Sequence, residues 1–126
     1  MILLVLCSLA ALALVALGLA ALFNPVGMSH FYGIPIEGEH AHGLGFVRAA
    51  GSRDLIIGLV LGAAIYYRFW PLIDVLLAAG ILLAAGDFWI AYHAAGRRFH
   101  KAHAFHGGGI IAFILVLAMA LFALGR

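Results

Sequence analysis

Residues 1–23 read MILLVLCSLAALALVALGLAALF, an apolar stretch that is interrupted only by Ser8 and Gly18 and that ends at Asn24-Pro25. At about 1.5 Å per residue, a helix of this length reaches about 35 Å, enough to cross the hydrocarbon core of a bilayer. A cleaved signal peptide would begin with basic residues and carry a shorter apolar segment of roughly 7–15 residues. We therefore expect residues 1–23 to be retained as a first membrane-spanning helix.

The composition of the whole chain is typical of a protein in contact with lipid. Of the 126 residues, 67% are hydrophobic and 10% are charged, whereas soluble domains are roughly half apolar and about a quarter charged. So few charged side chains cannot cover the surface of a soluble domain, but they suit a surface that faces lipid. The net charge of only +2, with no long basic stripe, argues against a nucleic-acid-binding protein. The sequence predicts an integral membrane protein.

Three further apolar stretches are long enough to cross the membrane. They are residues 44–67, 70–93 and 105–124. With no repeat and no polar linker, residues 1–126 form one domain. Four crossings joined by short connections predict an all-α fold, an up-down bundle of four transmembrane helices. Both termini then lie on one face, and the connections 24–43 and 94–104 lie on the other, which we call the loop face.

Basic residues are more numerous near the loop face than near the opposite face. Cytoplasmic connections of membrane proteins are enriched in Lys and Arg, so the sequence predicts that the connections 24–43 and 94–104 are cytoplasmic. The basic residues near the loop face are Arg48, Arg97, Arg98 and Lys101.

The second span contains charged residues. Residues 55–67 cover only about 20 Å as a helix, so the crossing must include Arg53 and Asp54. An ionisable group inside a span costs about 2.5–3.5 kcal/mol on insertion scales and indicates a functional site by default. Asp54 shares a helix face with Gly58 and is expected to face the bundle interior. Arg53 is offset by about 100°, so we expect the two to have different partners rather than to form only a mutual ion pair.

Candidate partners come from other spans at the same depth. Antiparallel packing brings Asp87, near the end of the third span, and His106, at the start of the fourth, towards Arg53 and Asp54. In a pocket of low dielectric constant, such a group can provide one protonated acid and one base. The alternative interpretation is a buried ion-pair network that fixes the register of the helices.

Histidines are a second candidate site on the loop face. His100, His103 and His106 recur every three residues, and His40 and His42 lie in the first long connection. Such residues can bind zinc or iron. The chain has no compact metal-binding helix motif, however, and histidines beside basic residues also suit a surface that faces lipid headgroups. We predict no cofactor as the main hypothesis and keep a zinc or iron site as the alternative.

The connection 24–43 is long and apolar, which indicates a lid or a re-entrant segment over a pocket, with a plain interfacial loop as the alternative. The residues predicted to line a substrate pocket are Asn24, Tyr32, Arg48, Gly51 and Gly58.

Short motifs follow one another along the chain. The most specific is Gly51-x-Arg53-Asp54-x-x-x-Gly58, and Gly86-Asp87 follows it. The others are Asn24-Pro25, Gly33-Ile34-Pro35, Arg48 and His106-Gly107. With these motifs the chain resembles, over nearly its whole length, a widespread uncharacterised family of small four-helix membrane proteins that is distantly similar to DoxX-like proteins. The resemblance implies the fold and the grouping of Arg53, Asp54 and Asp87.

The leading functional hypothesis is a membrane-embedded acid–base enzyme, an isomerase, cyclase or epoxide-opening hydrolase that acts on a small lipophilic substrate. Asp54 and Asp87 are the expected acid and base, in either order, while Arg53 stabilises a carboxylate or a developing negative charge and His106 relays a proton. Two other hypotheses are a small proton- or ion-coupled transporter, which as a homo-oligomer would enclose more volume, and an accessory subunit of a membrane redox complex.

Overall fold

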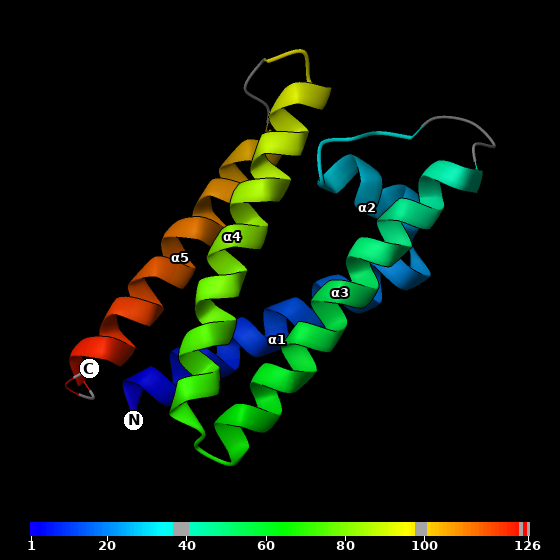
Figure 1. Ribbon diagram of the computed structural model, residues 1–126. Helices are drawn as coiled ribbons and strands as arrows, with labels where there is room; N and C mark the ends of the chain where they lie inside the picture. Colours follow the sequence, from blue (N-terminus) through cyan, green and yellow to red (C-terminus); the bar gives the residue numbers. More distant parts are fainter. Residues whose placement is uncertain (37–40, 98–100, 124, 126) are drawn as a thin grey trace.

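The computed structural model describes residues 1–36, 41–97, 101–123 and 125, and this part of the chain is helical, without strands. Four of its helices are long and apolar enough to cross a membrane. They are α1 (Ile2–Phe23), α3 (Ala41–Tyr66), α4 (Trp70–Ala94) and α5 (Lys101–Ala123), and a short helix, α2 (Pro25–Phe31), follows α1 (Figure 1). The predicted four-helix membrane bundle is confirmed. The orientation of the loop face stays a prediction, and Arg98 lies outside the described residues.

Helix α5 begins earlier than the predicted residue 105. Its first turns include Ala102 and His103, and both are buried. The His103 ring lies against the rings of Phe88 and Tyr92 on α4, with centroids 5.3 and 5.9 Å apart. Polar residues at this point indicated a connection in the sequence, but contact with α4 supports helix there.

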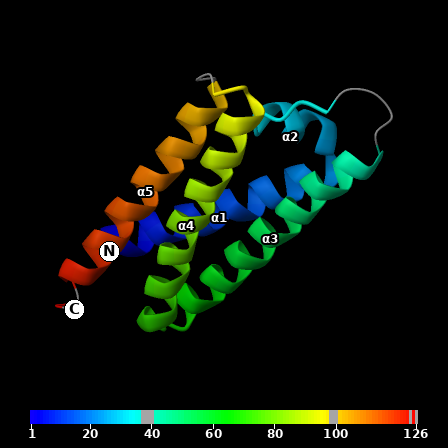
Figure 2. The same cartoon turned by 45° about the horizontal axis from the view of Figure 1, so that its top comes forward.

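The helices form two pairs that diverge towards the loop face. Helix α1 packs along α3, and α5 packs along α4. The turn between Tyr66 and Trp70 joins the pairs at the opposite end, with Arg68 in the left-handed conformation at φ 53°. Figures 1 and 2 show α3 and α4 separating from this turn. Contact between the pairs is therefore concentrated at one end of the molecule.

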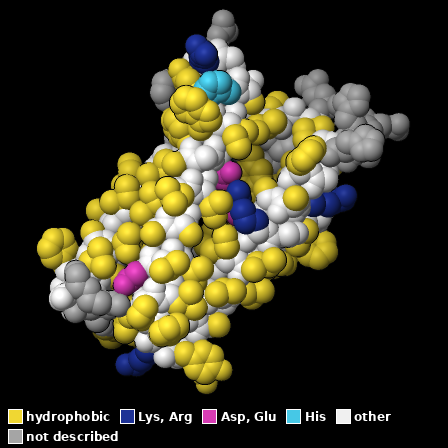
Figure 3. Space-filling model, viewed as in Figure 1, with side chains coloured by type: hydrophobic (Ala, Val, Ile, Leu, Met, Phe, Trp, Pro, Cys, Tyr) yellow, Lys and Arg dark blue, Asp and Glu magenta, His cyan; other side chains and the backbone are white. Residues whose placement is uncertain are grey.

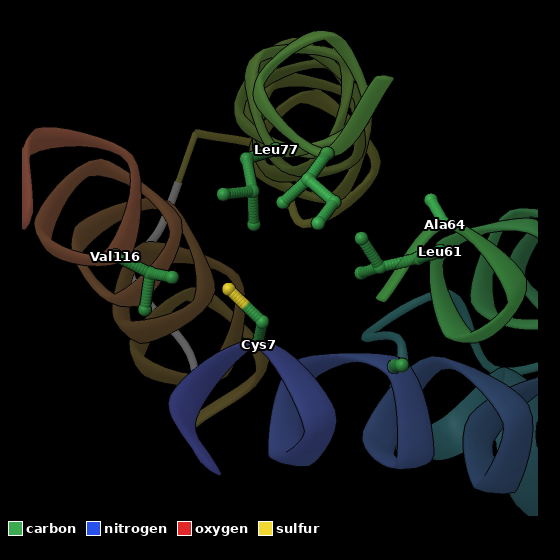
Figure 4. Close-up of a cluster of buried hydrophobic side chains, with 7 residues drawn as sticks. Cys7, Leu61, Ala64, Leu77 and Val116 are labelled. Atoms are coloured by element: carbon green, nitrogen blue, oxygen red, sulfur yellow. The ribbon is translucent and has the colours of Figure 1, made fainter. Parts of the chain in front are cut away.

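Buried apolar side chains from all four long helices close the end that carries the termini. Cys7 of α1, Leu61 of α3 and Leu77 of α4 have no exposed surface, and Val116 of α5 lies beside them (Figure 4). Hydrophobic side chains also predominate on the outer surface in Figure 3. Because lipid is as apolar as this core, close packing rather than removal from water holds the helices together here.

Glycines set the short distance between α1 and α3. A Cβ atom at Gly18 would lie 2.6 Å from the Gly51 carbonyl oxygen, and one at Gly58 would lie 2.9 Å from the Ala11 carbonyl oxygen. Both contacts are to backbone, which cannot rotate away as a side chain does. Small residues on these two faces therefore allow the helix backbones to touch.

The first connection begins with the short helix α2, and residues 32–36 after it form a turn and irregular backbone. The Asn24 side chain caps α2 by accepting a 3.1 Å hydrogen bond from the Gly27 N–H, and Pro25 occupies the first turn, where its missing N–H is not needed. Met28 is buried against Ala21 of α1 and Val47 of α3. Helix α2 thus covers the loop-face end of the α1–α3 pair.

We expect Gly58→Ala to destabilise the fold by about 1–3 kcal/mol, because the added methyl group would push the α1 and α3 backbones apart. Gly62→Ala is the matched control on the same helix, since a Cβ at Gly62 has no neighbour within 4 Å. Removing a helical glycine there should leave stability unchanged or raise it by up to about 1 kcal/mol. Reversible unfolding of the detergent-solubilised variants in SDS measures both effects. Equal stability of the two variants would contradict the proposed role of Gly58.

Candidate functional site

A charged cluster of three residues joins α3 to α4 in the loop-face half of the bundle. The Arg53 Nη1 and Nη2 atoms donate hydrogen bonds of 3.3 and 2.8 Å to the two carboxylate oxygens of Asp87. The Arg53 Nε atom donates a 3.0 Å hydrogen bond to Oδ1 of Asp54. We call Arg53, Asp54 and Asp87 the ionic cluster. Arg53 is its centre, because it bonds both carboxylates.

The expectation that Arg53 and Asp54 have different partners is met by the bond from Arg53 to Asp87 but not by the bond from Arg53 to Asp54. Arg53 does bond Asp87 on another helix, but it also forms an ion pair with its sequence neighbour Asp54, with Nη2 3.0 Å from Oδ1. The Cβ directions of adjacent helical residues diverge, but an arginine side chain is long enough to turn back to the next residue. The hydrogen bonds of one guanidinium therefore connect all three groups.

The three members of the ionic cluster differ in exposure. The Asp54 side chain is 10% exposed, whereas those of Arg53 and Asp87 are 32% and 30% exposed. With all three groups ionised, the cluster carries one net negative charge. Uncompensated charge is unfavourable inside a membrane, so uptake of one proton by a carboxylate would make the cluster neutral. All three members line the inner cavity, and Arg53 and Asp87 also line the outer cavity, so these two are the most open to a bound molecule.

Two cavities meet at the ionic cluster. The outer cavity, of about 460 Å³, lies below α2 and between α3 and α4, and the inner cavity, of about 620 Å³, lies among the four long helices. Both volumes are typical of small-molecule sites. Figure 3 shows acidic and basic side chains together in the hollow between α3 and α4, with mainly hydrophobic side chains around them. The residues that line both cavities are Tyr32, Arg53, Asp87 and His106.

Tyr32 and His106 line both cavities beside the ionic cluster. The Tyr32 hydroxyl oxygen is buried. Burial, helped by the negative charge of Asp54, raises the pKa of Tyr32 to about 12. The His106 ring stacks on the Tyr32 ring with centroids 6.1 Å apart, and its Nε2 atom lies 3.4 Å from the Tyr32 carbonyl oxygen. Tyr32 thus stays a neutral hydroxyl beside the carboxylates.

The structure places the predicted pocket residues in different surroundings. Tyr32 lines both cavities. Asn24 caps α2, and Gly51 and Gly58 pack against α1. Arg48 is exposed, and its Nε atom lies 3.5 Å from the Leu22 carbonyl oxygen. These four residues shape the fold near the site and do not line the two cavities.

Sequence reasoning missed the residues of α3 and α4 that line the outer cavity beside Arg53 and Asp87. They are apolar or small, and in a membrane protein such residues are equally common on lipid-facing surfaces, so their type carries little signal. The missed residues include Phe46, Val47, Ala50 and Ile90.

The histidine prediction is only partly covered by the structure. His103 packs against aromatic rings, and His106 lines the cavities. His40 and His100 lie outside the described residues, and so does the side chain of His42. Among the described residues, no three His, Cys, Asp or Glu side chains lie close enough together to hold a metal ion. The alternative of a zinc or iron site stays a prediction.

Comparison with known proteins identifies the family. The family described as "Domain of unknown function (DUF4267)" matches residues 11–122. The chain belongs to this family, because the match covers most of its length. No curated protein and no solved structure matches the chain. The predicted resemblance to an uncharacterised family is thus confirmed, and the family description assigns no activity.

We expect Arg53→Met to destabilise the protein by about 3–5 kcal/mol, because two carboxylates would remain near each other in the membrane without a counter-charge. Combining Arg53→Met with Asp54→Asn and Asp87→Asn should recover most of the loss, since no net charge then remains. Unfolding in SDS measures the difference. If the single variant is as stable as the triple variant, the ionic cluster does not carry the energetic role described here.

The raised pKa of Tyr32 predicts a loss of stability at alkaline pH. The unfolded-state pKa is near 10 and the folded value is about 12, so the contribution of the neutral hydroxyl is fully present below pH 10 and is lost as pH rises to about 12. Tyr32→Phe should therefore lose less stability than the wild type between pH 10 and 12. Tyr66→Phe, at an exposed position, should behave like the wild type. Thermal unfolding across this pH range measures the difference, and parallel curves for all three proteins would refute the assignment.

Proposed function

We propose that this member of a family of unknown function is a membrane-embedded acid–base enzyme that acts on a small lipophilic substrate. The observation that supports the proposal is the position of the ionic cluster at the junction of two cavities with otherwise apolar walls. A structural ion pair needs no hollow beside it, whereas an acid–base site needs reachable proton-transfer groups in a water-poor chamber.

The exposure of each side chain supports a division of roles. Asp87 lines both cavities and is the proton-transfer group that contacts substrate. Arg53 is equally reachable, and its guanidinium stabilises negative charge that develops on a substrate oxygen. Asp54 is more enclosed and holds Arg53 in place, with one carboxyl of the cluster carrying a proton. His106 is close enough to the cavities to relay a proton.

The simplest reaction for this set of groups is an isomerisation next to a carbonyl group. The Asp87 carboxylate removes a proton from a carbon beside the carbonyl, and the electron pair of the broken C–H bond moves towards the carbonyl oxygen, where Arg53 stabilises the charge. The substrate of such a step has a C=C bond next to the carbon that loses the proton. Asp87 returns the proton to the far carbon of that bond, the carbonyl group re-forms, and the C=C bond moves into conjugation with it, so the composition is unchanged and no cofactor is consumed. Ring closure and epoxide opening would use the protonated carboxyl as the acid towards a substrate oxygen.

Proton-coupled transport is the second candidate function, and the excess of carboxyl groups over basic groups in the ionic cluster, two against one, favours it. A cluster that becomes neutral when it binds one proton can couple that proton to movement of a ligand. The test is acidification of proteoliposomes on addition of lipophilic ligands. The enzyme hypothesis predicts no proton movement across the bilayer. The role of a redox-complex subunit and the similarity to DoxX-like proteins remain hypotheses.

Deuterium uptake tests the enzyme proposal before the substrate is identified. Detergent-solubilised protein is incubated in D₂O with a panel of lipophilic ketones, enones and epoxides, and mass spectrometry detects deuterium incorporation or conversion. We expect Asp87→Asn to lower the rate by about 10²-fold or more, because the group that transfers the proton is lost. Asp74→Asn is the matched control, a carboxylate on the same helix that does not line either cavity. If folded Asp54→Asn and Asp87→Asn variants keep the wild-type rate, the acid–base proposal is wrong.

A further inference from the structure

The polar groups of the site are concentrated where the two cavities meet. The four residues that line both cavities are the ones with polar side chains at the junction, namely Tyr32, Arg53, Asp87 and His106. A ligand oxygen therefore finds hydrogen-bond donors in the middle of the combined space. The two ends of that space have a different character.

The outer cavity offers little to a polar group beyond the junction. Ile34, Ile36 and Val47 form part of its wall. The Ser29 hydroxyl also lines it, but this group already donates a 2.8 Å hydrogen bond to the Val26 carbonyl oxygen and accepts one of 3.3 Å from the Ile36 N–H. The outer cavity is thus suited to an apolar part of a ligand.

The inner cavity is an apolar chamber that runs from the ionic cluster towards the core. Its wall comes from α1, α3, α4 and α5. Away from the junction, apolar side chains and glycine backbone supply this wall, and the side chains include Leu14, Leu83 and Phe113. A hydrocarbon chain fits these surroundings, whereas an oxygen atom placed there would be buried without a hydrogen bond.

The hollow also opens towards the lipid. Phe46 of α3 and Ile90 of α4 line the outer cavity, and they are 80% and 55% exposed. Both residues lie on helices that diverge at this end (Figure 1). A lipophilic molecule can therefore enter sideways from the bilayer, between α3 and α4, without passing through water.

We propose that the ligand of this site is an elongated lipophilic molecule whose reactive oxygen lies within its apolar skeleton, with one apolar arm in each cavity. That the oxygen takes part in a reaction rests on the proposed function, and the class of substrate is what this inference adds. Lipid and cavity wall are about equally apolar, so the arms alone give little preference for the site over the bilayer. Selectivity then comes from placing the oxygen at Arg53 while both arms fill the space.

Two isomeric long-chain ketones test the proposal on the wild-type protein. They have the same chain length, and the carbonyl group lies at mid-chain in one and next to the chain end in the other. Occupancy is measured by native mass spectrometry of the detergent-solubilised protein. We expect the mid-chain ketone to bind about tenfold more tightly or better, because the other isomer must leave one arm empty or bury its oxygen without a partner. Equal binding, tighter binding of the chain-end isomer, or no binding of either overturns the proposal.

Filling each cavity separately tests the two arms. Ala50→Phe places a ring in the outer cavity and Ala112→Phe places one in the inner cavity. Either variant should abolish or reverse the preference for the mid-chain isomer, because only one arm can then be housed. Ala85→Phe, at an exposed position of α4 that lines neither cavity, should keep it. A preference for the mid-chain isomer that survives in folded Ala50→Phe and Ala112→Phe proteins overturns the two-arm arrangement. If a variant does not fold, the binding of the two ketones to the wild-type protein tests the arrangement instead.

Binding and chemistry can fail independently in these experiments. If the mid-chain ketone binds preferentially but takes up no deuterium from D₂O, the acid–base function fails and the two-arm binding site stands. If only the chain-end isomer takes up deuterium, the chemistry stands and the substrate class proposed here is wrong.

Discussion

The ion pair between Arg53 and two carboxylates is the interaction on which the rest of this site depends. A charged side chain in the hydrocarbon region is unfavourable by itself, and one guanidinium that bonds Asp54 and Asp87 offsets much of that cost. The bond to Asp87 also links α3 to α4, two helices that diverge from the turn that joins them (Figure 1). Between these helices the contact at this level is therefore a polar bridge rather than packed apolar side chains.

The two ends of the bundle are built on different principles. At the end that carries the termini, apolar side chains from four helices fill the interior. Towards the loop face, glycines hold α1 tightly against α3, α2 covers their end, and the α4–α5 pair leans away. Because α1 packs closely on α3 and α4 packs closely on α5, space for the two cavities remains between these two pairs. A protein of this size can thus hold cavities of ligand size without an unusually large fold.

The same arrangement limits the chemistry that the site can perform. The polar groups that line its cavities near the ionic cluster are two carboxyl groups, a guanidinium, a histidine and a tyrosine hydroxyl, and the surrounding walls are mainly apolar. Such groups exchange protons and stabilise charge on oxygen, and the walls select molecules that already prefer lipid. A neutral Tyr32 hydroxyl beside Asp54 keeps this part of the cluster from gaining a further negative charge.

Much of this protein could be predicted from its sequence. The thickness of the bilayer sets the length of a span, so the apolar stretches indicated four helices, and the energetic cost of intramembrane charge singled out Arg53, Asp54 and Asp87 as residues that must find partners. Tertiary structure alone decided how they pair, because a long arginine side chain can reach its neighbour and another helix at once. It also decided that Gly51 and Gly58 contact α1, and that Phe46 and Ile90 line a cavity. Helix contacts, cavity walls and lipid-facing surfaces all select small or apolar residues in a membrane, so residue type cannot distinguish them.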